Sequence, residues 1–340
     1  MSKLLIYISV LILICSCSNG AIEQSLNTIH ISGFENHSYD FASLASSVDT
    51  LPLYVRKDAT EISAVKDICL NGSQIYVVDE SGLISMFDIH SGELLSQIKK
   101  VGHSSQEYVN VSSIKCVDDT LFVLDGNSRK IIKYNKNFSY LGKINLDFIP
   151  LDFEITKDGF LFSRLDVSSG EYRFIQTDRN GNTKNKFLTS SPFGEQIYTS
   201  KSFVNNTCLN EIYLHEPMSE DIYMWNDGKI SPVYNLIFQS DNLNKKKEEN
   251  DPILKDYFIT SNHFICSFIY DNKQCYCIYS KKDGSIKAGS FDLNSGLPFY
   301  PICQKGNTLI GIYYTADLGA LKNCKIKCKN SALTLLFYNF

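Results

Sequence analysis

The chain has 340 residues, of which 44% are hydrophobic and 21% are charged, with 21 Phe and 20 Tyr against 4 Met. This richness in β-forming residues predicts an all-β protein with a large core and argues against a helical or disordered chain. The net charge is −4 and the basic residues are scattered, which excludes the electrostatic footprint of a nucleic-acid-binding protein, so we expect no nucleic-acid partner.

The amino terminus has the pattern of an export signal. Lys3 precedes the apolar run 4–14, which at about 11 residues is too short to span a bilayer. Residues 14–17, Ile-Cys-Ser-Cys, resemble the bacterial lipobox, and the resemblance implies cleavage before Cys17, lipidation of Cys17 and anchoring by its acyl chains. A plain signal peptide with an incidental cysteine is the alternative. Because Ser18 replaces the aspartate of inner-membrane retention, we expect an outer-membrane lipoprotein, in a leaflet that the sequence leaves open.

Residues 17–48 are polar and serine-rich, which predicts a lipidated amino terminus followed by a flexible tether. The runs 29–31 and 51–55 are strand-like. One of them is expected to join the last sheet of the repeat described next and so close a ring of sheets.

Residues 65–98 form the unit that the rest of the chain repeats. Four short apolar runs, 65–70, 75–78, 83–88 and 93–98, are separated by turns rich in glycine and asparagine, which tolerate the positive φ of tight hairpins. The unit predicts one four-stranded antiparallel sheet that is apolar on both faces. Such a sheet must be packed between copies of itself.

The copies follow at a regular interval. The second strand of each unit is anchored at Ile75, Leu121, Leu161, Ile212, Ile265 and Leu309, at intervals of 40 to 53 residues. About 40 to 50 residues per repeat is typical of propeller blades. We therefore predict a signal peptide over residues 1–16, a tether over 17–48 and a single six-bladed β-propeller over 49–340.

Three segments carry a family resemblance. Residues 75–79 form an apolar-aromatic-apolar-apolar-Asp strand, Phe87-Asp88 leads to a Gly turn, and the connection 102–108 ends in Glu107-Tyr108. Together they resemble the six-bladed β-propeller lipoproteins, NHL-like or TolB-like, of Gram-negative bacterial envelopes, and later segments match in the same order.

The resemblance implies the fold but no settled activity. In the connection, Ser104-Ser105-Gln106 replaces the Gly-Pro-Gly of the family, while the Glu-Tyr anchor is kept. The aspartates that end the second strands, Asp79 and Asp125, are expected to accept hydrogen bonds from turn amides.

Nine of the eleven cysteines lie after the signal region. Most are expected to be small buried hydrophobes. Cys275 and Cys277 share one strand face, and Cys324 and Cys328 lie four apart, so a zinc site and a Cys324–Cys328 disulfide are alternatives to free thiols. Because a C-x-C pair within a strand fits zinc poorly, we predict no metal and no cofactor.

No catalytic or nucleotide-binding motif is present, so an enzyme is unsupported. The anchor spacings place Arg164 and His215 where the first two repeats carry Val78 and Leu124. If this position lies near the mouth of the channel, the two side chains would bind an anionic or sugar ligand, more strongly below about pH 6.5, where the imidazole gains charge. The alternative is that both reach solvent or pair with neighbouring glutamates.

Tyr108 and Tyr300, near loops, have the side chains that stack on sugar rings, although packing between blades explains them equally well. With Glu107 they complete the candidate binding residues. The sequence therefore predicts a binding or interaction scaffold for a glycan, peptide or partner protein, with a glycan-active hydrolase or lyase as the alternative.

Overall fold

The computed structural model describes residues 26–164, 167–168, 170–189, 201–216, 219–239, 251–292, 297–320, 331 and 333–340. Two subjects of prediction lie outside these residues: the signal region with Cys17, and the pair Cys324 and Cys328. No helix among the described residues is long and apolar enough to cross a membrane.

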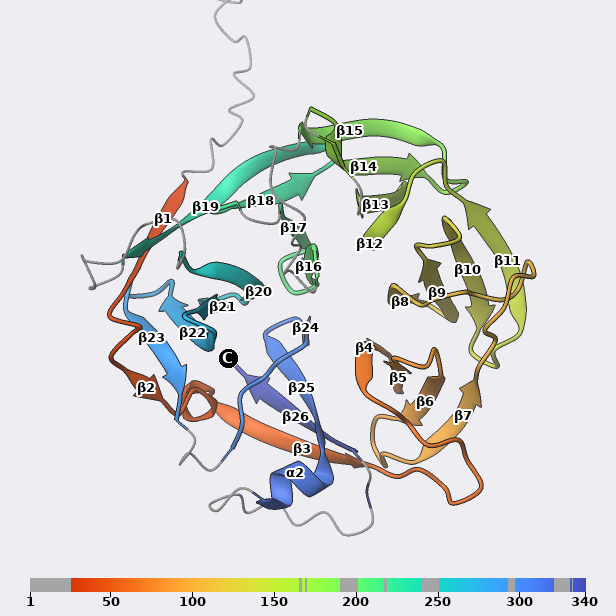
Figure 1. Ribbon diagram of the computed structural model, residues 1–340, viewed down its shortest axis with the longest axis horizontal. Coiled ribbons are helices and arrows are strands. Elements are labelled where there is room, and N and C mark those ends of the chain that lie inside the picture. The colour runs from red at the N-terminus through yellow and green to blue at the C-terminus, as the bar shows by residue number, and fades with distance from the viewer. Residues whose placement is uncertain are drawn as a thin grey trace, which may run out of the picture.

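Six antiparallel sheets stand around a central axis like the blades of a propeller (Figure 1), which confirms the predicted fold. The blades are, in chain order, β4 (Val65–Asn71), β5 (Gln74–Asp79), β6 (Ile84–Asp88), β7 (Leu94–Ile98); β8 (Ser113–Val117), β9 (Thr120–Asp125), β10 (Lys130–Asn135), β11 (Tyr140–Asn145); β12 (Pro150–Thr156), β13 (Gly159–Arg164), β14 (Tyr172–Asp178), β15 (Thr183–Thr189); β16 (Phe203–Asn206), β17 (Glu211–His215), β18 (Asp221–Asn226), β19 (Lys229–Gln239); β20 (Ile253–Ile259), β21 (His263–Tyr270), β22 (Lys273–Ser280), β23 (Ile286–Phe291); and β24 (Cys303–Lys305), β25 (Thr308–Tyr314), β26 (Leu333–Asn339) with β3 (Ser47–Leu53). A short helix, α2 (Thr315–Ala320), follows β25.

The ring is closed by β3, which pairs antiparallel with β26 and forms the outer strand of blade six. This confirms that one amino-terminal strand completes the last blade. Just beyond β3, the Tyr54 N–H donates to the Gly92 carbonyl (2.8 Å), and the Leu94 N–H donates to the Tyr54 carbonyl (3.1 Å). The same segment therefore ties blade six to blade one.

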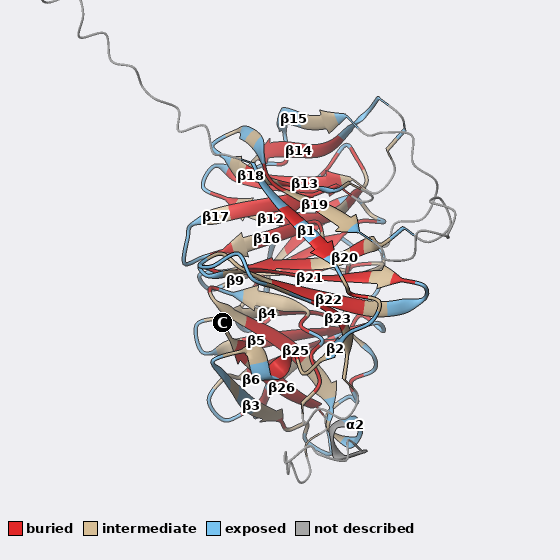
Figure 2. Cartoon of the chain, turned by 90° about the vertical axis from the view of Figure 1, so that its left-hand side faces the viewer, coloured by how far each residue is buried: buried red, intermediate tan, exposed pale blue. Residues whose placement is uncertain are grey.

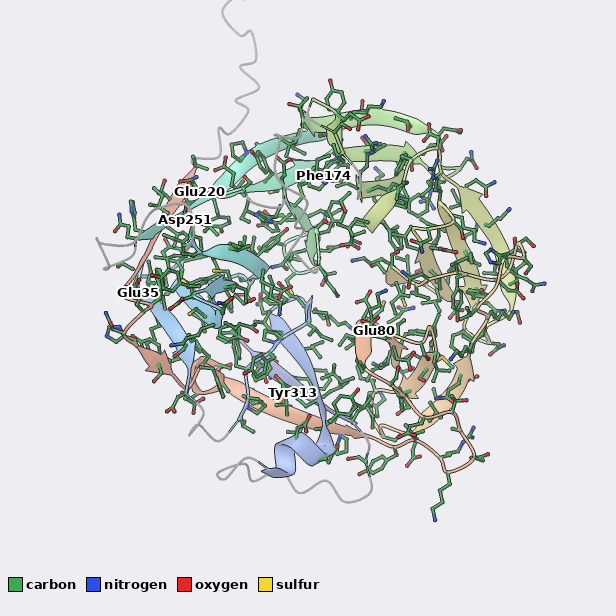
Figure 3. The ribbon with its side chains drawn as sticks, viewed as in Figure 1. Glu35, Glu80, Phe174, Glu220, Asp251 and Tyr313 are labelled. Carbon is green, nitrogen blue, oxygen red and sulfur yellow. The ribbon has the colours of Figure 1, made fainter. Side chains whose placement is uncertain are left out.

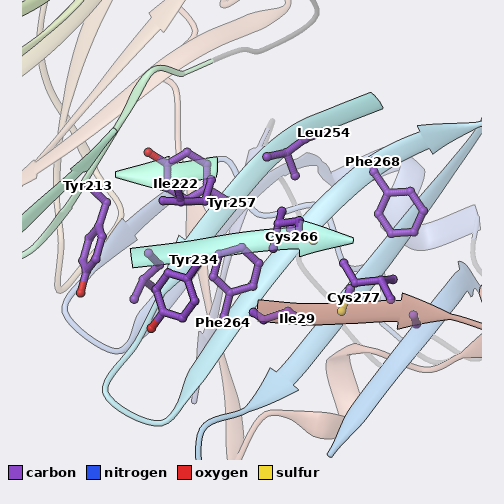
Figure 4. Close-up of a cluster of buried hydrophobic side chains, with 14 of the residues drawn as sticks. Ile29, Tyr213, Ile222, Tyr234, Leu254, Tyr257, Phe264, Cys266, Phe268 and Cys277 are labelled. Carbon is purple, nitrogen blue, oxygen red and sulfur yellow. The ribbon is translucent and has the colours of Figure 1, made fainter. Parts of the chain in front are cut away.

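The amino-terminal segment departs from the predicted tether. β1 (Asn27–Ser32) adds a parallel fifth strand to β19, β2 (Ser38–Tyr39) adds one to β23, and a 3₁₀ turn spans Ala42–Leu44. The segment from β1 to the 3₁₀ turn thus lies along blades four and five, and residues 47 and 48 already belong to β3 of blade six, so residues 27–48 are not a free tether. The physical reason is burial: Ile29 (Figure 4) and Ile31 alternate with polar residues and are 1% and 0% exposed at the edge of the sheet.

Both faces of each blade are buried, as predicted, and Figure 2 shows the buried residues running through the strands. Val77 and Val78, which point to opposite faces of β5, are both 0% exposed and belong to different clusters, on the sides of blade six and blade two. Phe174 of blade three, labelled in Figure 3, packs edge-on against Phe203 of blade four, with ring centroids 5.7 Å apart. Aromatic contact between blades therefore carries much of the core.

The strand-ending aspartates hold turns, as predicted. Asp79 accepts hydrogen bonds from the Leu83 N–H in the next turn (2.9 Å) and from the Ser63 N–H ahead of its own blade (2.8 Å). Asp125 repeats this arrangement, with Ser128 (3.1 Å) and Val109 (2.8 Å). Each carboxylate therefore fixes both a hairpin and the entry into its blade.

Candidate functional site

A cavity of about 270 Å³ lies at the centre of the ring, lined by the innermost strand of every blade. Positions on the inner strands of different blades can be compared by counting back from the first hairpin of each blade, and residues with the same count lie at the same depth in the channel. The residues at the depth of Cys69 all line the cavity: Cys69, Lys115, Glu154, Val204, Phe258 and Cys303. Charged, apolar and thiol groups therefore share this wall.

Two residues earlier on the inner strands lies a second layer, with an aspartate in blades one, three and five: Asp67, Asp152 and Asp256. Each follows an irregularity in its strand that shifts the pairing by one residue. Asp67 and Asp152 reach the following blade, where they accept hydrogen bonds from the N–H groups of Ile114 (3.0 Å) and Ser202 (3.1 Å). These two carboxylates therefore join neighbouring blades.

Lys201 spans the channel. It lies just before β16 in blade four, and its Nζ donates to Oδ1 of Asp67 in blade one at 2.8 Å, although these blades stand opposite each other in the ring. Burial alone would raise the pKa of Asp67, but Lys201 and the hydrogen bond from Ile114 more than offset it, so the pKa lies below its ordinary value. The pair is therefore ionised at neutral pH.

A second ion pair joins neighbouring blades. Lys115 Nζ of β8 lies 3.0 Å from Oε2 of Glu154 in β12, and the two side chains are 20% and 7% exposed. Burial lowers the pKa of Lys115, but Glu154 and the nearby Asp152 and Asp67 raise it further, so that it lies above its ordinary value. Buried ion pairs cost much of their attraction in desolvation, so the charges point to a role beyond stability.

Neutral amides complete the polar lining. Asn205 Nδ2 donates to Oε1 of Glu154 (3.3 Å), and Gln304 in blade six donates to the carbonyl of Gly306 (2.6 Å). Positive, negative and amide groups thus alternate around one small space. Such a lining suits a ligand that has both donors and acceptors and little net charge.

The predicted equivalence of Arg164 with Val78 is wrong by one residue. Asp152 pairs with Ser163 as Asp67 pairs with Val78, so Ser163 holds that position. The error arises at the first hairpin of blade three, where the turn makes Phe160 and not Leu161 the second residue of its strand. Because side chains alternate along a strand, Arg164 points to the opposite face.

Arg164 instead pairs with Glu171 in its own blade, at 3.6 Å. His215 of blade four is 0% exposed, donates from Nε2 to the Ser219 carbonyl (2.9 Å) and packs against the Tyr257 ring of blade five. Burial lowers the pKa of His215 to about 4, so it stays neutral at the pH where we expected it to gain charge. The structure does not bring Arg164 and His215 together at the cavity.

The remaining candidates also lie away from the cavity. Tyr108 is 0% exposed, and its hydroxyl donates to the Gly82 carbonyl (2.8 Å) and accepts from the Lys100 N–H (3.1 Å). Glu107 accepts from the Ser104 N–H (2.9 Å), so Glu107 and Tyr108 anchor the link between blades one and two, as the kept Glu-Tyr pair predicted.

Tyr300 is 40% exposed and its ring lies beside those of Tyr276 and Phe291. The expectation that most cysteines are buried is confirmed for Cys266, Cys275 and Cys277 in blade five. It is wrong for Cys208, which is exposed, and Cys69, Cys116 and Cys303 are partly exposed. The sequence interpretation missed the cavity residues because it read the second strands and not the inner ones. Counting back from each first hairpin would have found them.

Fold and site together define a six-bladed β-propeller with a polar cavity in its central channel. The chain belongs to the family of the domain of unknown function DUF4934, whose sequence profile matches residues 26–334. No curated protein is significantly similar to it in sequence.

Solved structures share the fold at low sequence identity. A protein of Bacteroides fragilis described as exported is 17% identical, with 92% of this chain and 99% of that chain covered and a TM-score of 0.74. A member of the DUF4221 family from Bacteroides vulgatus is 10% identical, with 87% and 96% covered and a TM-score of 0.52. A catalytically inactive virginiamycin B lyase from Staphylococcus aureus is 10% identical, with 85% and 99% covered and a TM-score of 0.47. For the two Bacteroides proteins, at these identities, the likeness is one of fold alone.

Proposed function

We propose that this protein is a binding protein of the cell envelope that holds a small polar ligand in its central cavity. The observation that carries the proposal is the cavity itself, which is bordered by all six blades and lined by Lys115 and Lys201, each paired with a carboxylate. An apolar channel would have stabilised the ring at lower cost, because ion pairs must be desolvated.

The lining favours a neutral or zwitterionic ligand. Lys115 and Lys201 are balanced by Glu154 and Asp67, and the wall also carries Asp256 and Lys305, one charge of each sign. It therefore favours neither strong anions nor strong cations over other ligands. Small-molecule sites have volumes of roughly 300 to 1,000 Å³, and this cavity lies just below that range. A single sugar unit of a glycan, or the end of a peptide, matches both its size and its chemistry.

An envelope location completes the proposal. The lipobox resemblance at Cys17 supports lipidation, and several acyl chains at about 0.8 kcal/mol per buried CH₂ hold a protein firmly on a membrane. The similar protein of Bacteroides fragilis, described as exported, supports the same side of the cell membrane. We place the protein at the outer membrane, where a short tether leaves the propeller free to meet its ligand.

Calorimetry with the full chain tests the proposal, using a panel of monosaccharides, oligosaccharides, amino acids and dipeptides. A ligand that binds wild type should lose about 10-fold or more in affinity, or about 1.4 kcal/mol, in the double variant Lys115→Gln, Glu154→Gln, which keeps the side-chain shapes and removes the charges. The matched control is Lys136→Gln, Asp119→Asn, an exposed pair at 3.6 Å on the surface.

Unchanged binding in the cavity variant would place the ligand elsewhere and refute the cavity as the site. The same mixtures should also be examined for products. Turnover of a glycan that is lost in Glu154→Gln would replace binding by the alternative function, a glycan hydrolase or lyase.

A further inference from the structure

We propose that Cys69 and Cys116 are a redox-active thiol pair, which closes to a disulfide between blades one and two in the wall of the central cavity. The inference does not depend on the ligand. It rests on where two inner strands place their side chains.

The two thiols face each other across one interface. The Asp67 side chain of β4 points toward blade two, because it accepts a hydrogen bond from the Ile114 N–H there. Side chains two residues apart on a strand point to the same face. Cys69 is two residues further along β4, so it also turns toward blade two. On β8 the Lys115 side chain points toward blade three, where it pairs with Glu154. Cys116 is the next residue, so its side chain points to the opposite face, toward blade one.

The packing agrees with this assignment. Cys69 and Cys116 both border the same hydrophobic cluster between blades one and two, which includes Tyr76 and Ile114. Burial first, and then the neighbouring Cys69 thiol, raise the pKa of the Cys116 thiol, which agrees with two adjacent thiol groups at this interface. A disulfide joins Cβ atoms roughly 3.5 to 4.5 Å apart, so it suits side chains that face each other in this way.

Cys69 and Cys116 are also within reach of a reagent. Both are partly exposed and line the cavity, so a small molecule that enters the channel meets them. Cys266 and Cys277 are also opposite each other, on β21 and β22, but both are 0% exposed. Cys303 lines the cavity too, but it packs into the interface between blades six and one.

The chemistry is thiol–disulfide exchange with a small-molecule disulfide such as oxidised glutathione. One cysteine thiolate attacks a glutathione sulfur, which forms a mixed disulfide and releases the first glutathione thiolate. The second cysteine thiolate attacks the bound cysteine sulfur, forms the Cys69–Cys116 bond and releases the second glutathione. Two protein thiols are oxidised, one glutathione disulfide is reduced to two thiols, and the two protons pass to the leaving thiolates.

The experiment treats the full chain with oxidised glutathione, blocks the remaining thiols by alkylation and maps the products by peptide mass spectrometry. Wild type should yield a peptide pair linked through Cys69 and Cys116. The chain should also melt several degrees higher, because the bond closes a loop of about 48 residues. Cys69→Ser and Cys116→Ser should each stop at a mixed disulfide on the remaining cysteine, with no rise in melting temperature.

Two matched controls keep the test specific. Cys303→Ser changes another thiol in the cavity wall and Cys208→Ser changes an exposed one, and both should still form the bond. Glutathione retained on Cys69 or Cys116 of wild type without a linked pair would overturn the proposal. A bond from Cys69 to Cys303 would also overturn it, since that partner belongs to a different blade interface.

Discussion

Replacing Asp67 by Asn tests whether one buried carboxylate holds three blades together. Asp67 is 4% exposed and accepts hydrogen bonds from the Lys201 Nζ (2.8 Å), the Ile114 N–H (3.0 Å) and its neighbour the Ile68 N–H (2.8 Å). Asparagine offers one oxygen and turns an NH₂ group toward donors. At least one of the bonds that join blades is lost, and Lys201 keeps its charge without a partner carboxylate.

The cost follows from these contacts. A buried hydrogen bond to a charged group contributes about 1.5 to 3 kcal/mol, and leaving one charge of a buried pair alone costs about 3 to 5 kcal/mol. The Lys201 side chain is 25% exposed and borders the cavity, so water will recover part of the second cost. We expect Asp67→Asn to lower the free energy of unfolding by about 2 to 4 kcal/mol.

Urea unfolding, followed by the fluorescence of the single tryptophan, Trp225 in β18, measures this change. Asp119→Asn is the matched control, because Asp119 pairs with Lys136 at the surface with its side chain 79% exposed, and it should change stability by less than about 0.5 kcal/mol. If Asp67→Asn costs no more than this control, the bond across the channel does not stabilise the ring.

Acid titration gives an independent check on Asp67. Its folded pKa is lowered, so its contribution is complete above the ordinary aspartate pKa of about 3.9 and is lost as the pH falls through the lower folded value. The difference between wild type and Asp67→Asn should therefore be full at pH 7 and shrink below about pH 4. A difference that stays constant well below pH 4 would show that the charge of Asp67 is not responsible.

Three further changes have expected outcomes. His215 has a pKa of about 4 in the folded state against about 6.5 in the unfolded state, so wild type should lose about 3 kcal/mol of stability between pH 6.5 and pH 4. The variant His215→Gln should remove this dependence on pH, whereas the control His103→Gln, at an exposed position, should keep it. Gly92→Ala should lower the free energy of unfolding in urea by more than about 2 kcal/mol, because the new Cβ would lie 1.9 Å from the Pro52 carbonyl oxygen. Gly72 also has a positive φ but has open space around it, so Gly72→Ala should cost about 1 kcal/mol. Equal losses in the two variants would refute the steric argument. Cys17→Ala should release the protein from the membrane fraction and change its gel mobility, and unchanged fractionation would count against lipidation.

The sequence by itself determined the blades. Turn residues such as Asn71 and Gly72 and the alternation of apolar residues act over a few positions, so the hairpins and the count of six could be predicted without knowledge of contacts between distant residues. The roles of Asp79 and Asp125 were predicted for the same reason, whereas the anchoring role of Glu107-Tyr108 was predicted from the family resemblance. Each of these carboxylates bonds to residues close to it in sequence or at the entry to its own blade.

The tertiary structure decided the candidate site and the course of the amino terminus. Lys201 and Asp67 are 134 positions apart and meet only because their blades stand opposite each other in the ring. The position assigned to Arg164 depended on the length of one tight hairpin, and an error of one residue there places its side chain on the wrong face of the strand. The strand that contains Ile29 and Ile31 pairs with the edge of β19, which is more than 190 residues away in the sequence. Closing the ring gathers distant inner strands around one cavity, and no local pattern in the sequence records which of their side chains will meet there.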